Sequence, residues 1–243
     1  MKKEILFVLL NNFADWEGAY IAPNLQCGVE PGSESKYMVK TVSITKEPVV
    51  SCGGFRVLPD YDINDIPADY AGLVLIGGMR WFTLEAGLLV PLVKTAIENR
   101  KLVAGICNAS VFLGMHGFLN GVNHTSNGLD YLKEYAGANY TGELHYINQP
   151  AVRDGNIVTA NGFGSFDSLL FSLWLINAPG NGDDLLVEIN VIPHKPYQFS
   201  AAHTRGNRKR QQRPCANVFV LQCLHQLFNF FIAVGFQLWL NDF

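Results

Sequence analysis

The fold of this chain is decided by the stretch Leu102-Val103-Ala104-Gly105-Ile106-Cys107-Asn108-Ala109. Its first five residues form a continuous apolar run, which is typical of a parallel strand buried on both faces. Cys107 follows at once, and the spacing in Asn108–Met115 indicates a helix. Small residues flank the cysteine, as a sharp strand-to-helix turn with close packing requires. The stretch therefore predicts a strained nucleophile elbow with Cys107 at its tip.

Further strands and helices alternate around this elbow. Ile5–Leu10 and Leu73–Ile76 are also continuous apolar runs, Tyr37–Ile44 alternates as a strand does, and Leu88–Asn99 has helical spacing. Two hairpins are indicated, one with a glycine turn near Gly53-Gly54 and one around Asp154-Gly155. This order predicts a mostly parallel sheet covered by helices on both faces.

Candidate functional groups follow three of these strands. They are the segment Asp15-Trp16-Glu17, where Asp15 is a candidate helix cap, the pair Gly77-Gly78, and Cys107. Ligands of parallel sheets bind outside the carboxyl ends of the strands, so we expect the three to converge. A helix N-terminus would lower the pKa of Cys107, and burial would raise that of Glu17 until it bonds the sulfur as an acid.

Other residues near these motifs are weaker candidates. The amides of Gly78 and Asn108 could form an oxyanion hole, and His124 could act as base or acid. Trp16, Gly77, Arg80 and Trp81 adjoin the motifs and could line a substrate pocket, with Arg80 binding a carboxylate or phosphate. Structural readings stand beside these: an inert buried cysteine, a plain glycine turn, a solvated Glu17 or Arg80, and a structural His124.

Composition excludes several classes of protein. The 243 residues are 49% hydrophobic and 16% charged, with a formal net charge of −3, so nothing global points to nucleic acid or an anionic membrane. Five cysteines without a CxxC pair or Cys/His ligand spacing argue against disulfides and a metal site. The N-terminal apolar run is too short for a signal peptide and lacks a cleavage site, which predicts a cytoplasmic protein.

The last third of the chain departs from this pattern. We predict an α/β domain over residues 1–177 and an atypical extension over residues 178–243. A basic run at 205–213 precedes an apolar stretch at 219–240, which is long enough to span a bilayer but contains several polar side chains. Three readings stay open: a membrane anchor, which the polar residues disfavour, a packed or partner-binding helix, and a non-native reading frame.

These motifs together resemble the ThiJ/PfpI family, a branch of the class I glutamine amidotransferase-like superfamily. The resemblance rests on Asp15-Trp16-Glu17 after the first strand, Ile76-Gly77-Gly78, Ala104–Asn108 and Asn161-Gly162, and it covers roughly residues 3–175. It implies a flavodoxin-like (Rossmann-like) three-layer sandwich, a homodimer, and no cofactor. It also implies Cys107 as nucleophile, Glu17 as its carboxyl partner, Gly78 and Asn108 as oxyanion donors, and His124 as a neighbour.

The chain differs from two branches of this family. The proteolytic branch has a histidine directly after the nucleophile, where this chain has Asn108, and nothing after Cys107 matches the late His-x-Glu pair of glutaminases. The resemblance then implies a glyoxalase- or deglycase-like enzyme that acts on a small carbonyl or amide substrate through Cys107. The alternatives are a redox-sensing or binding protein in which Cys107 is oxidised, and a scaffold whose pocket is a relic.

Overall fold

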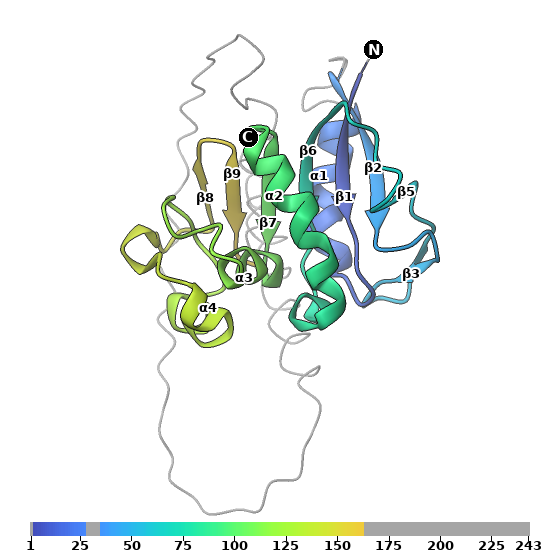
Figure 1. The fold of residues 1–243 in the computed structure, drawn as a ribbon. Coiled ribbons are helices and arrows are strands. Elements are labelled where there is room, and N and C mark those ends of the chain that lie inside the picture. Colours follow the sequence, from blue (N-terminus) through green and yellow to red (C-terminus); the bar gives the residue numbers. More distant parts are fainter. Residues whose placement is uncertain (1, 28–34, 163–243) are drawn as a thin grey trace, which may run out of the picture. The chain divides into compact units, whose positions relative to one another are not determined.

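A computed structural model describes residues 2–27 and 35–162 of the chain (Figure 1). Within these residues no helix is both long and apolar enough to cross a membrane. The predicted extension over residues 178–243, with its basic run and its apolar stretch, lies outside the described residues.

The centre of the fold is a seven-stranded sheet with the order β5-β2-β1-β6-β7-β9-β8. Neighbouring strands are parallel except for β8, which pairs antiparallel with β9 at one edge. The predicted mostly parallel sheet is therefore confirmed. Its strands are β1 Lys3–Val8, β2 Tyr37–Ser43, β5 Tyr61–Asp62, β6 Tyr70–Leu75, β7 Leu102–Ile106, β8 Ala151–Asp154 and β9 Ile157–Ala160.

Helices cover both faces of the sheet, which makes three layers. Figure 1 shows α1 (Asp15–Cys27) on one side of the sheet and α2 (Val90–Glu98) on the other. Side chains alternate along a strand, so Ile5 and Phe7 pack with Ile21 of α1, while Leu6 and Val8 belong to the core on the α2 side. That second core also contains side chains of α3 (Asn108–Met115). The flavodoxin-like architecture is confirmed.

The remaining elements are short. The predicted glycine hairpin is present as β3 Val49–Val50 and β4 Arg56–Val57, and the hairpin around Asp154-Gly155 is β8–β9. The other helical segments are α4 Leu129–Ala136 and the 3₁₀ turns η1 Met79–Phe82, η2 Leu84–Leu89, η3 Gly137–Asn139 and η4 Glu143–His145.

Two local predictions differ from the structure. The helix expected over Leu88–Asn99 begins as the 3₁₀ turn η2 and becomes α-helical only at Val90, next to Pro91. Asp15 was predicted to cap α1, but its Oδ2 accepts a hydrogen bond from the Gly53 N–H at 2.7 Å. Asp15 therefore ties the start of α1 to the β3–β4 turn.

Candidate active site

The turn between β7 and α3 holds Cys107 in a strained conformation. Cys107 has φ 53° and ψ −124°, and its N–H donates to the carbonyl of Ala160 at 2.9 Å. Non-glycine residues rarely adopt positive φ, so surrounding packing must impose it. A Cβ at Gly105 would lie 2.8 Å from Leu113 Cδ1 and 3.2 Å from Ser110 N. The elbow therefore requires a small residue at this position, as its sequence predicted.

The three predicted segments meet beside Cys107. Glu17 is fully buried, and its Oε2 accepts a hydrogen bond from the Gly77 N–H at 2.5 Å. A Cβ built at Gly77 would lie 2.5 and 2.7 Å from the two carboxyl oxygens of Glu17 and 2.7 Å from Cys107 Cβ. The ends of β1, β6 and β7 thus bring the Glu17 carboxyl and the Cys107 thiol together. Only glycine at position 77 leaves room for both.

Burial controls the protonation of this pair. It raises the pKa of Glu17 to about 8, against hydrogen bonds from the Gly77 N–H and the Cys107 thiol that lower it. Glu17 is therefore mostly protonated at neutral pH, as expected. Glu17 Oε1 is buried without a hydrogen bond of normal geometry.

The pKa of Cys107 does not follow the prediction. Burial raises it, and so does the charge that Glu17 carries once ionised. The backbone N–H of Asn108 at the start of α3 lowers the pKa of Cys107, as the helix N-terminus was expected to do, but burial outweighs it. The expectation of a lowered thiol pKa in the resting site is therefore wrong, because the elbow that strains Cys107 also desolvates it.

A side chain that sequence reasoning missed also contacts the thiol. Asn127 Nδ2 donates to Cys107 Sγ at 3.3 Å, and its Oδ1 accepts the Gly162 N–H at 2.9 Å. Asn127 is exposed in the loop before α4. The sequence offers only Asn127-Gly128 as a signal, and such a pair normally indicates nothing more than a turn.

Gly162 lies against the thiol from a fourth strand end. It follows β9, and a Cβ there would lie 3.0 Å from Cys107 Sγ. Its carbonyl accepts a hydrogen bond from Trp16 Nε1 at 3.2 Å. Trp16, which was predicted to line the pocket, is thus joined to the site through Gly162.

The two residues predicted as oxyanion donors lie next to each other. Gly78 has φ 152°, and a Cβ there would lie 2.6 Å from the carbonyl oxygen of Asn12, so only glycine fits. Its own carbonyl accepts a hydrogen bond from Asn108 Nδ2 at 3.2 Å. The buried Asn108 side chain also accepts one from the Tyr131 hydroxyl at 2.9 Å.

His124 is not brought to Cys107. It is fully buried, with Nδ1 bonded to the carbonyl of Val122 at 2.7 Å and Nε2 to the Tyr140 hydroxyl at 2.8 Å. Burial lowers the pKa of its imidazole. Both ring nitrogens hold the loop after α3 in place, so the structural reading of His124 replaces the catalytic one.

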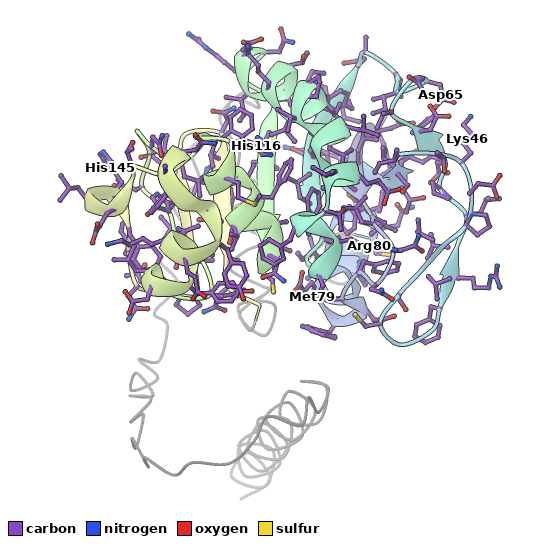
Figure 2. The ribbon with its side chains drawn as sticks, turned by 60° about the horizontal axis from the view of Figure 1, so that its bottom comes forward. Lys46, Asp65, Met79, Arg80, His116 and His145 are labelled. Atoms are coloured by element: carbon purple, nitrogen blue, oxygen red, sulfur yellow. The ribbon has the colours of Figure 1, made fainter. Side chains whose placement is uncertain are left out.

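Trp81 and Arg80, both predicted to line the pocket, lie in different environments. Trp81 is 1% exposed, donates from Nε1 to the carbonyl of Ile76 at 2.7 Å, and packs on Phe112. The prediction that Trp81 lines a pocket is therefore wrong, because it is a core residue. Arg80 is exposed and follows the Gly77-Gly78 turn together with Met79; Figure 2 labels both.

The other described histidines serve elsewhere. His116 packs against the rings of Phe112 and Phe118, and His145 lies in η4; both are labelled in Figure 2. No group of three or more His, Cys, Asp or Glu side chains suited to a metal ion occurs among residues 2–27 and 35–162.

Comparison with known proteins finds a family model and a relative that each match most of this chain. A sequence model described as the DJ-1/PfpI family matches residues 3–176. The chain is 36% identical over 187 residues to "Uncharacterized protease YdeA" of Bacillus subtilis, which covers 76% of this chain and 89% of that relative.

Solved structures give the same picture. The DJ-1 superfamily protein Atu0886 of Agrobacterium tumefaciens is 38% identical, with a TM-score of 0.61 over 71% of this chain and 90% of its own. A thiJ/pfpI family protein of Bacillus anthracis is 30% identical, with a TM-score of 0.64 over 71% of this chain and 84% of its own.

Proposed function

The chain belongs to the DJ-1/PfpI family, and on that premise we propose that it is a cysteine-dependent enzyme that acts on a small carbonyl or amide compound. The observation that carries the proposal is the pairing of Cys107, strained at φ 53°, with the fully buried carboxyl of Glu17. A buried carboxyl whose pKa is raised toward neutral pH is suited to exchange protons with a neighbouring nucleophile.

The reaction begins from the pair after it has lost one proton. In the minor tautomer that reacts, the remaining proton lies on Glu17 and the negative charge on Cys107 Sγ, because the raised pKa of the thiol places the charge on Glu17 in most molecules. The Sγ of this tautomer attacks the carbonyl carbon of the substrate. A bond forms between sulfur and carbon, and the carbonyl oxygen takes up the electron pair. The amides of Gly78 and Asn108 are the donors we assign to this oxyanion. Glu17 then returns its proton to the group that leaves or to the oxyanion.

Small carbonyl compounds suit the site better than peptides. The residue after the nucleophile is Asn108, and within the described part of the chain no histidine has a hydrogen bond or ring contact with Cys107. Glu17 is therefore the group we assign to proton transfer. The relative named an uncharacterized protease makes peptide hydrolysis worth measuring beside it.

A substrate screen of the full chain tests the proposal. The panel contains α-oxoaldehydes, small amides and a peptide library, and Cys107→Ala is the control that lacks only the sulfur. We expect at least one small carbonyl or amide to be consumed by the wild type and not by the variant. Equal consumption of every compound by both proteins would contradict the proposal.

A second candidate function, oxidant sensing, is favoured by Glu17 Oε1. This buried oxygen has no hydrogen bond of normal geometry and lies beside Cys107. A peroxide would oxidise the thiolate to a sulfenate and leave as an alcohol or water, and the protonated carboxyl could then bond the new oxygen. Stoichiometric addition of oxygen to Cys107 by mass spectrometry, with no turnover of any carbonyl, would replace the enzyme proposal by this one.

A further inference from the structure

The loop before α4 supplies the thiol with a partner that the proposed reaction does not yet use. We propose that Asn127 is a further catalytic residue, whose amide stabilises the Cys107 thiolate by donating to Sγ, and that Asn108 and Tyr131 position it. The inference rests on the proposed function, because it concerns the same nucleophile.

The direction of each hydrogen bond at Asn127 is fixed by its neighbours. The Gly162 N–H can only donate, so the atom of the Asn127 amide that faces it at 2.9 Å must be the oxygen. Nδ2 then faces the two acceptors that remain, Cys107 Sγ and Asn108 Oδ1, each at 3.3 Å. The amide therefore presents a donor to the sulfur and cannot rotate without losing the bond to Gly162.

Asn108 is oriented in the same way. Its Nδ2 donates to the carbonyl of Gly78 at 3.2 Å and contacts Met79 Sδ at 3.3 Å, which leaves Oδ1 to accept. The Tyr131 hydroxyl donates to that Oδ1 at 2.9 Å, beside the bond from Asn127. A chain of directed bonds thus links α4 to the thiol.

The chemistry of an amide separates its role from that of Glu17. A donor to an anion forms a charge-assisted hydrogen bond, which is stronger than a neutral one. The Asn127 amide accordingly lowers the pKa of Cys107 against the effect of burial. Because an amide neither gains nor loses a proton in this pH range, Asn127 can stabilise the charge but cannot accept the proton of the thiol. The proton transfer predicted for His124 is therefore assigned to Glu17, and Asn127 stabilises the charge of the thiolate.

The test measures iodoacetamide alkylation of Cys107 from pH 6 to 9 in the full chain, with peptides resolved by mass spectrometry. Asn127→Leu removes the donor at similar volume, and exposed Cys27 in the same sample is the internal control. We expect Asn127→Leu to slow alkylation of Cys107 about ten-fold across this range, the effect of one bond to a charged group, and to leave Cys27 unchanged.

Two further variants separate stabilisation of charge from a structural role. In a Glu17→Gln background, where Cys107 titrates alone, Asn127→Leu should still slow alkylation about ten-fold at every pH from 6 to 9. Asn127→Asp keeps the shape and the oxygen that accepts the Gly162 N–H, so it serves if the leucine variant does not fold. It should slow Cys107 at least as much, because it adds a negative charge beside the sulfur.

The outcomes distinguish this proposal from the proposed function. If wild-type Cys107 reacts while Asn127→Leu leaves the rate unchanged, alone and in the Glu17→Gln background, the role of Asn127 is refuted and the enzyme proposal stands. If Asn127→Asp behaves like the wild type, Asn127 only holds Gly162. An unreactive wild-type Cys107 across the whole pH range would overturn both proposals.

Discussion

At the scale of single residues, the site is a pair of acids that share one environment. Glu17 and Cys107 both lie where burial makes ionisation costly, and the charge of Glu17 raises the pKa of Cys107 further. Their protons are therefore lost in two steps that belong to the pair, and the first step creates the singly charged form from which the proposed reaction starts.

This coupling predicts the pH dependence of the thiol. Below about pH 8 Glu17 is protonated, so alkylation of wild-type Cys107 should rise with pH. Above pH 8 the charge of Glu17 opposes formation of the thiolate, and the rate should level off. In Glu17→Gln no such charge forms, so the rate should keep rising and exceed that of the wild type by about ten-fold at pH 9. Identical profiles for the two proteins would show that the groups do not interact.

The same carboxyl predicts how stability depends on pH. Its pKa is about 8 in the folded protein and 4.5 ordinarily, so the folded state holds the extra proton between these values. The wild type should therefore lose stability as pH rises from about 4.5 to 8, whereas Glu17→Gln should not. From pH 5 to 7 the free energy of unfolding of the variant should gain about 2 kcal/mol on the wild type. Urea unfolding at both pH values measures this, and a constant difference would contradict it.

At the scale of elements, the site depends on how closely α3 follows β7. Gly105 stands where any side chain would meet Leu113 and the backbone of Ser110. Gly105→Ala should therefore destabilise the fold by about 1 to 3 kcal/mol, the usual cost of an overpacked core. Gly87 is a matched control, because a Cβ there meets nothing within 4 Å. Equal unfolding free energies for Gly105→Ala and Gly87→Ala would rule out this packing constraint.

The elements were largely readable from the sequence because strong local patterns mark them. The apolar run of β7 and the small residues of the elbow were sufficient to place Cys107, and strand topology was sufficient to bring Glu17 and Gly77 to it. Asn161-Gly162 was noted only for the family resemblance and Asn127 was not noted at all, so neither Gly162 nor Asn127 was assigned to the site. Both act through loop geometry that depends on distant contacts, such as the bond between them.

The errors in the site have a common cause. His124 and Trp81 are residue types that often serve in sites, and each stands near a motif in the sequence. Sequence proximity does not reveal which way a side chain points, and here the ring nitrogens of His124 bond to Val122 and Tyr140 while Trp81 enters the core. The prediction of a lowered pKa for Cys107 failed for a similar reason, because the burial that raises this pKa is a property of the folded surroundings.

At the scale of the whole molecule, we predict a homodimer. The β3–β4 hairpin and the segment after it expose Phe55 and Leu58 at 69% and 70%, and large exposed apolar side chains favour association. Light scattering on the full chain should give twice the mass of one chain, and Phe55→Lys with Leu58→Lys should halve it. Leu84→Lys, at a separate position that is 99% exposed, is the control. A wild type with the mass of a single chain would refute the dimer.

The bond between Trp16 and Gly162 joins residues that are 146 positions apart, and Gly162 lies against the sulfur of Cys107. During synthesis the cysteine leaves the ribosome long before the glycine does. Until the glycine emerges, the Cys107 thiol lacks Gly162 as a neighbour. It also lacks the Asn127 amide that Gly162 holds in place. The chemistry proposed for this site thus requires the complete sheet, and a thiol-directed label that recognises the mature site would distinguish finished molecules from nascent ones.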